Sequence, residues 1–225
     1  MRERIVLANA GYELTRSVFA PAELETLALS ASGAGVRSLL DVEAVRTFAR
    51  DPRLLALAGS GAFAVRAILF DKSSEANWAL GWHQDSSVAV GERVEVDGFG
   101  PWTTKDGVPH AIAPVSLLES MVSLRVHLDD CGEENGPLRV IAGSHALGRL
   151  SAEQISAHVD QISRRVGWGD RSAVTTCLAS RGDVLAFKPL LLHASSSARV
   201  VSHRRVLQLE YAFGPLPAPL RWRWS

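Results

Sequence analysis

The chain has only two cysteines, no net charge and no long hydrophobic run, and each of these absences excludes a class of protein. Cys131 and Cys177 cannot build a disulfide framework in 225 residues, so we expect two reduced thiols in a cytoplasmic protein. The 24 basic residues balance the 24 acidic ones, which gives no electrostatic argument for a nucleic-acid partner or an anionic membrane. The apolar runs, such as residues 54–59, are far shorter than the roughly 20 residues of a spanning helix. Charged residues among positions 1–5 stand where a signal peptide would be apolar, so we expect neither a membrane association nor secretion.

The length suits a single domain over residues 1–225, and the sequence pattern changes once, near residue 60. Before that point, helix-start signals occur at Pro21, Asp41 and Pro52, with proline or acid in the first turn. Asp41 and Asp51 are residues of the type that caps a helix. Residues 1–60 are therefore predicted to form a helical N-terminal part.

Residues 61–215 read as short β-segments separated by turn residues. The predicted strands are 63–70, 86–90, 121–128, 138–141, 173–178, 183–187 and 204–213. This number of short strands favours an antiparallel barrel or a two-sheet roll. Residues 91–118 are rich in Gly, Pro and Val and are predicted to be a long irregular, lid-like loop. Ser151 and Glu153 indicate a brief surface helix over 151–155.

The residues with the clearest chemistry are His83 and Asp85, just before an apolar strand. In extended backbone, residues two apart point to the same side, so an imidazole and a carboxylate can bind one ion. Two histidines and one carboxylate with open positions are the arrangement of non-haem Fe(II) oxygenases. His193, at the end of an apolar run, is the best candidate for the third ligand.

The spacing of His83 and Asp85 is weak evidence taken alone, because the same pattern occurs at His127 and Asp129. We interpret the second pair as structural, since it runs into a turn. His145 is a further candidate ligand, but it follows a strand and a turn. His110, His158 and His203 have no partner at a useful spacing and are predicted to be surface or packing residues.

An oxygenase that uses 2-oxoglutarate also needs a cation for the distal carboxylate of that cosubstrate, and the planar guanidinium of arginine suits this role. Arg204 and Arg205 compete for it. Strand alternation places Arg205 with Leu207 and Leu209, and Arg204 on the more polar face with Gln208. The polar face suits a ligand-lined interior, but alternation alone does not decide between the two arginines.

Several segments together resemble the phytanoyl-CoA dioxygenase family of Fe(II)/2-oxoglutarate-dependent oxygenases. They are residues 68–85, which end in Trp-His-Gln-Asp, residues 138–145, residues 189–195 and Arg204. The resemblance covers residues 60–213. It implies a mostly β fold, a double-stranded β-helix of the jelly-roll or cupin-like type, with N-terminal helices buttressing one sheet.

The resemblance also implies roles for single residues. His83, Asp85 and His193 match the iron ligands; Arg204 matches the clamp on the 2-oxoglutarate carboxylate, and Ser195 the hydroxyl that assists it. Weaker matches to positions that line the cosubstrate pocket are Arg125, Arg66 and Phe70. The implied cofactors are Fe(II), 2-oxoglutarate and O2.

The resulting hypothesis is an enzyme that hydroxylates, or otherwise oxidises, a C–H bond of a small molecule and releases succinate and CO2. The alternative is a cupin-like metal-binding protein without oxygenase turnover. Leu80 and Val88 lie near the ligands in the sequence and favour an apolar substrate. Trp222 and Trp224, beside two arginines, can dock either on the body of the protein or on a partner.

Overall fold

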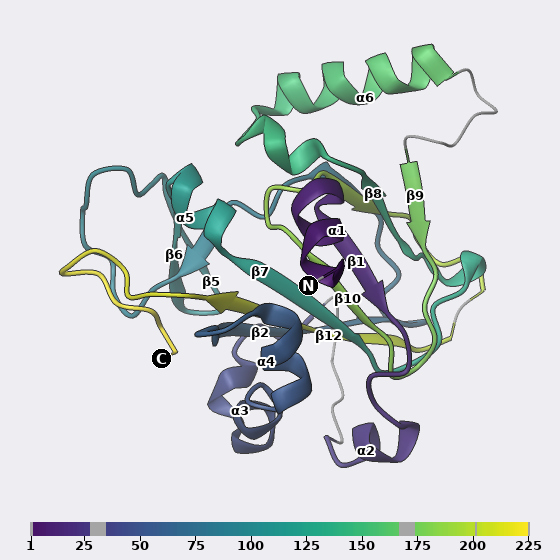
Figure 1. Cartoon of the computed structure of the whole chain (residues 1–225). Helices are drawn as coiled ribbons and strands as arrows, with labels where there is room; N and C mark the ends of the chain where they lie inside the picture. Colours follow the sequence, from purple (N-terminus) through teal and green to yellow (C-terminus); the bar gives the residue numbers. More distant parts are fainter. Residues whose placement is uncertain (1, 28–34, 167–173, 201, 225) are drawn as a thin grey trace.

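Three antiparallel sheets form the body of the protein in a computed structural model that describes residues 2–27, 35–166, 174–200 and 202–224 (Figure 1). The largest sheet has the order β1 (Tyr12–Thr15), β10 (Val184–Phe187), β7 (Val122–His127), β12 (Arg204–Ala212) and β2 (Phe63–Lys72). The second has the order β3 (Leu80–His83), β11 (His193–Ser195), β8 (Leu138–Ile141) and β9 (Val174–Cys177). The third has the order β4 (Ser87–Ala89), β6 (Val108–Ile112) and β5 (Trp102–Lys105). The first two sheets make the two walls of the double-stranded β-helix that the sequence predicts.

The helices are short except the last. They are α1 (Arg2–Ala10), α2 (Pro21–Glu25), α3 (Glu43–Phe48), α4 (Pro52–Ala58), α5 (Val115–Ser120) and α6 (Ala152–Val166). Three 3-10 turns also occur, at η1 (Leu39–Asp41), η2 (Glu133–Asn135) and η3 (Ser144–Leu147). Within the described residues, no helix has both the length and the apolar character needed to cross a membrane.

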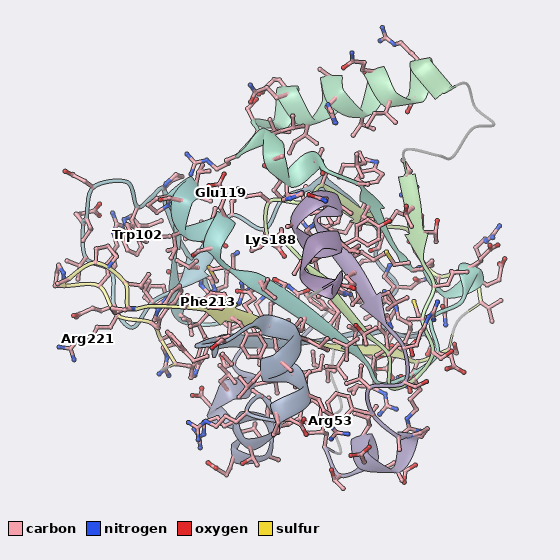
Figure 2. The ribbon with its side chains drawn as sticks, viewed as in Figure 1. Arg53, Trp102, Glu119, Lys188, Phe213 and Arg221 are labelled. Atoms are coloured by element: carbon pink, nitrogen blue, oxygen red, sulfur yellow. The ribbon has the colours of Figure 1, made fainter. Side chains whose placement is uncertain are left out.

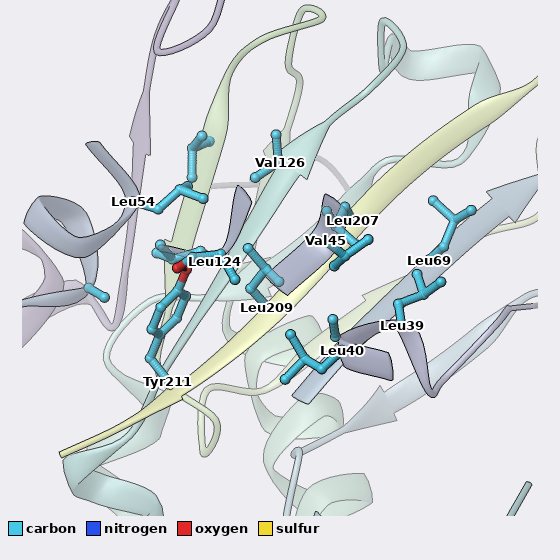
Figure 3. Close-up of a cluster of buried hydrophobic side chains, with 14 of the residues drawn as sticks. Leu39, Leu40, Val45, Leu54, Leu69, Leu124, Val126, Leu207, Leu209 and Tyr211 are labelled. Carbon is cyan, nitrogen blue, oxygen red and sulfur yellow. Dashed lines mark hydrogen bonds between the residues drawn. The ribbon is translucent and has the colours of Figure 1, made fainter. Parts of the chain in front are cut away.

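The five-stranded sheet separates an apolar outer face from a polar inner face. On β12, Leu207, Leu209 and Tyr211 pack outward against η1, α3 and α4. Figure 1 shows α3 and α4 below β2 and β12. Figure 3 shows this core, where Val45 and Leu54 from the helices meet Leu124 and Leu209 from the sheet. The hydroxyl of Tyr211 donates to the Ala49 carbonyl oxygen at 2.8 Å. The N-terminal helices therefore buttress the sheet and leave its inner face free for ligands.

Residues 91–118 are not wholly irregular, so that part of the prediction is wrong. β5 and β6 form a hairpin, which turns at Asp106 (φ 49°) and Gly107 (φ 77°). Asp-Gly suits the positive φ values of such a two-residue turn. The hairpin adds to β4, which begins two residues after Asp85. The segment therefore lies against the strand that follows Asp85 instead of forming a free loop.

The C-terminal residues dock on the body, which decides between the two possibilities left open for the tryptophans. Trp222 pairs with Val90 and donates to the Gly214 carbonyl oxygen at 3.0 Å. Trp224 donates to Asp41 Oδ1 at 2.7 Å. In Figure 2, Arg221 lies on the same side of the molecule as Trp102 of β5.

Two local predictions also need correction. Asp51 caps α4 by accepting a hydrogen bond from the Arg53 backbone, as expected, but Asp41 caps nothing and accepts from Trp224 instead. The surface helix predicted over 151–155 extends to Val166 as α6, because Ile155, Val159 and Ile162 continue a helical apolar stripe.

Candidate metal and cosubstrate site

His83, Asp85 and His193 meet at one point between the two walls of the β-helix. Their ligand atoms all lie within 4.8 Å of one another. His83 Nε2 is 3.9 Å from Asp85 Oδ1, and His193 Nε2 is 3.8 Å from Asp85 Oδ2. Among the described residues, no other group of three His, Cys, Asp or Glu side chains has this geometry.

Strand pairing explains why the two histidines meet although they are far apart in the chain. β3 and β11 are antiparallel neighbours, and His83 stands directly opposite His193 in their register. Residues opposite each other on one sheet face have Cβ atoms about 5 Å apart. The two ring centroids accordingly lie 4.1 Å apart. Asp85 is held just beyond β3, where its backbone N–H donates to the Pro189 carbonyl oxygen at 2.9 Å.

The hydrogen bonds of the two imidazoles occupy Nδ1 of each ring and leave Nε2 free for a metal ion. Nδ1 of His83 contacts the Gly81 carbonyl oxygen at 2.8 Å, and Nδ1 of His193 contacts that of Leu191 at 2.8 Å. A carbonyl oxygen only accepts, so each Nδ1 carries the proton and each Nε2 keeps its lone pair. Burial lowers the pKa of His193 to about 4, which keeps this imidazole neutral near pH 7. The donor set fits a divalent ion such as Fe(II).

Gln208, on the five-stranded sheet, orients the Asp85 carboxylate. Gln208 Nε2 donates to Asp85 Oδ2 at 3.3 Å, and Arg125 Nη1 donates to Gln208 Oε1 at 3.0 Å. Burial raises the pKa of Asp85, but the charges of His193, His83 and Arg66 oppose it, and the net direction is downward. The carboxyl group is therefore ionised and available as an anionic ligand.

A cavity of about 410 Å³ surrounds the three residues and has one strongly cationic end. Arg204 is 3% exposed there and donates to the Gly136 carbonyl oxygen at 3.1 Å, while its Nε has no partner. Lys72 Nζ donates to Ser195 Oγ at 3.1 Å and to the Ser196 carbonyl oxygen. Burial, and then the charges of Arg204 and Arg125, lower the pKa of Lys72 to about 8. No acidic side chain forms an ion pair with Arg204 or Lys72 among the described residues, so this end suits an anion.

The other end of the cavity holds a buried ion pair and a lysine. Arg66 Nη1 lies 3.1 Å from Glu210 Oε1, and both side chains are under 10% exposed. Lys105 Nζ donates to Ser87 Oγ at 2.9 Å. Arg204 and Glu210 are near opposite ends of β12, about 20 Å apart at roughly 3.3 Å per residue. The cavity therefore has two separate polar ends with the three candidate ligands between them.

Most of the other residues singled out in the sequence line the same cavity. Phe70 lies on its wall, with the Arg125 guanidinium 5.3 Å from its ring centre. Arg205 does not line the cavity; it binds Asp129 on the outside through two guanidinium contacts of 2.7 and 2.8 Å. Leu80 lines the cavity, but Val88 is buried in a different apolar cluster, so half of the argument for an apolar substrate is wrong.

The remaining histidines have structural surroundings. His145 Nε2 contacts the Ala8 carbonyl oxygen at 3.0 Å and is not near the three ligands. His203 Nδ1 contacts Asp71 Oδ2 at 2.8 Å. His110 and His127 are buried, and burial lowers their pKa values to about 4 and about 3. His158 lies on α6.

Sequence reasoning assigned no role in the site to Lys72, Lys105, Gln208 or Glu210, although it placed Gln208 on the polar face of Arg204. Alternation along β2 places Lys72 on the face of Arg66 and Phe70, and alternation along β12 places Gln208 and Glu210 on the face of Arg204. That signal was available for these three residues. Lys105 reaches the site from a separate hairpin, and no local pattern links it to the ligands.

Comparisons with known proteins agree with this geometry. A family profile described as phytanoyl-CoA dioxygenase matches residues 38–206. L-proline trans-4-hydroxylase of Streptomyces griseoviridis is 29% identical over 158 residues, which are 62% of this chain and 50% of the relative. The chain thus spans about half the length of the curated relative it matches.

Solved structures that share the fold include HygX and EctD. HygX from Streptomyces hygroscopicus, with nickel and 2-oxoglutarate bound, has a TM-score of 0.62 and 17% identity, over 94% of this chain and 86% of that one. EctD from S. alaskensis, with bound Fe, has a TM-score of 0.68 and 19% identity, over 94% of this chain and 75% of that one.

Proposed function

Because the chain belongs to the phytanoyl-CoA dioxygenase family, we propose that it is an Fe(II)- and 2-oxoglutarate-dependent dioxygenase acting on a small molecule. It hydroxylates or otherwise oxidises a C–H bond and releases succinate and CO2. The observation that carries the proposal is the meeting of His83, Asp85 and His193 in one cavity with an unpaired cationic end. A relative that acts on proline supports a small-molecule substrate.

In this proposal, His83, Asp85 and His193 hold the iron through the Nε2 atoms of the two imidazoles and one carboxylate. Three ligands from one side leave positions for the cosubstrate and for O2. When bound, Fe(II) with 2-oxoglutarate supplies the oxidising chemistry, and the protein supplies orientation and exclusion of water. Gln208 acts as a positioning residue, since it fixes the direction of the Asp85 carboxylate.

The cationic end binds the distal carboxylate of 2-oxoglutarate. Arg204 provides a guanidinium and Ser195 a hydroxyl on the cavity wall, and the fully buried Lys72, which donates to Ser195, adds a second positive charge. Charge-assisted hydrogen bonds of this kind are about twice as strong as neutral ones. The Arg125 guanidinium and the Phe70 ring form the wall beside it. Arg66 was also expected to bind the cosubstrate, but its place next to Glu210 supports a role at the other end.

Anaerobic addition of Fe(II) and 2-oxoglutarate tests the proposal. A visible charge-transfer band is expected in the wild type and in His158→Ala, a control on α6, and no band is expected in His193→Ala. Succinate should then form in air. An equally strong band in His193→Ala contradicts the assignment of the ligands.

The second candidate, a metal-binding cupin-like protein without turnover, has the same donor set in its favour. It predicts bound metal but no consumption of O2 and no succinate with any metabolite. The free, buried cysteines agree with the expectation of a cytoplasmic protein, and that location stays a prediction.

A further inference from the structure

One cation in the cavity has no acidic partner and is not at the cosubstrate end. Lys105 is half-buried, and among the described residues its ammonium group forms no ion pair; it donates only to Ser87 Oγ at 2.9 Å. Two other cations lie at this end, but each already has a carboxylate. Arg66 is 3.1 Å from Glu210, and Arg37 is 3.4 Å from Asp106. Lys105 therefore leaves one positive charge uncompensated in this part of the cavity.

The surroundings of Lys105 also point to a ligand. The Arg66 Nε is buried without a hydrogen-bond partner, so the wall beside Lys105 holds an unused donor. Burial lowers the pKa of Lys105, and the charge of Arg66 lowers it further, while Glu210 and Asp85 oppose this. An incoming anion would relieve the cost of burying this charge.

The position of Lys105 relative to the metal ligands limits how long the substrate can be. Ser87, its hydrogen-bond partner, is two residues beyond Asp85, so the two Cα atoms are at most about 7 Å apart. A group held by Lys105 thus lies within a few bonds of the place where oxidation occurs. A single uncompensated charge matches a monoanion better than a phosphate dianion.

On the basis of the function proposed above, we propose that the substrate is a small carboxylic acid whose carboxylate binds Lys105, assisted by Arg66, at the end of the cavity opposite Arg204. The oxidised carbon lies only a few bonds from this carboxylate. The residue that recognises it belongs to the β5–β6 hairpin, so that hairpin determines specificity.

Binding is tested without turnover, on protein loaded with Zn(II) and 2-oxoglutarate, by saturation-transfer NMR. The probes are amino and hydroxy acids of three to six carbons, each paired with its primary amide and with a phosphate monoester of similar size. Acids should bind and amides should not. The best acid should bind at least about tenfold more weakly to Lys105→Met, which corresponds to about 1.4 kcal/mol, and nearly normally to Lys105→Arg.

Arg93→Met is the matched control, because Arg93 is an exposed cation of the same segment that pairs with Glu95 outside the cavity. It should leave binding of the acid unchanged. Three results overturn the proposal: amides or phosphate esters that bind as well as acids, a panel in which no acid binds, or an unchanged affinity in Lys105→Met. If the dioxygenase function is wrong, the iron-loaded protein forms no succinate although it still binds acids. That result is distinct from the three above.

Discussion

Single side chains at the cationic end of the cavity control cosubstrate binding, and Lys72 makes this dependent on pH. Its pKa in the free protein is lowered to about 8. Below that pH the ammonium group is charged and attracts the distal carboxylate of 2-oxoglutarate that Arg204 and Ser195 bind. As pH rises through about 8 the free protein loses this proton, so the KM for 2-oxoglutarate should rise.

The neighbours of Lys72 do not titrate in this range. Arg204 and Arg125 stay cationic, and burial raises the pKa of the Cys131 thiol. Lys72→Arg keeps its charge and should abolish the rise in KM, whereas kcat at saturating 2-oxoglutarate should change little in either protein. The measurement is the KM for 2-oxoglutarate from pH 6.5 to 9, a range chosen to span roughly one unit or more on each side. An identical rise in Lys72→Arg rules out Lys72 as the titrating group.

Gln84, between two candidate ligands, is predicted to be a structural anchor. Its side chain donates to the carbonyl oxygens of Gly148 and Leu190 at 2.8 and 2.7 Å and accepts from the Leu150 N–H at 2.8 Å. Gln84→Ala leaves three backbone groups without partners and should lower the free energy of unfolding by about 2–4 kcal/mol. Denaturant unfolding measures this, with the exposed Gln161→Ala as control. A loss no larger than in the control shows that water replaces these contacts.

At the scale of elements, the turn after η2 positions the cosubstrate end. Gly136 has φ 68°, its carbonyl oxygen accepts from Arg204, and a Cβ there would lie 2.9 Å from Lys72 Nζ and also against the Ser196 carbonyl oxygen. Gly136→Ala should therefore cost about 1–2 kcal/mol for the backbone alone and raise the KM for 2-oxoglutarate by displacing both cations.

Gly132, at the start of the same turn, provides the control. It has φ −86°, and no atom lies within 4 Å of a Cβ built there. Gly132→Ala should change neither stability nor KM by a measurable amount. Equal effects of the two substitutions would show that the turn tolerates no alanine at all, and would remove the specific role of Gly136.

The sequence predicts elements well where a strand has an apolar face and poorly where it does not. Every predicted β-segment contains a strand, because alternation along segments such as β7 and β12 reports burial against the helices. Three short strands were missed. β1 lies inside residues 1–60, which were predicted to be helical, and has only four residues. β3 and β11 have three or four residues, and their alternation is interrupted by the ligands. The β5–β6 hairpin was hidden by the composition of residues 91–118. Composition records that a segment is rich in Gly and Pro, but not that a neighbouring strand pairs with it.

At the scale of the whole molecule, the N-terminal helices are integral to the fold and not an appendage. Leu54 of α4 is fully buried against the five-stranded sheet. Leu54→Ala should lower the free energy of unfolding by about 2–5 kcal/mol, from lost burial and the cavity left behind. Leu57→Ala, on a partly buried neighbour, should cost less. Chemical denaturation of both variants measures the difference, and equal losses would place Leu54 outside the core.

The pairing of β3 with β11 has a consequence for how the protein is made. During synthesis, His83 and Asp85 leave the ribosome long before His193, so a nascent chain offers an ion only two of the three side chains. The complete donor set exists only after β11 has paired with β3. Metal loading is therefore expected to follow tertiary folding.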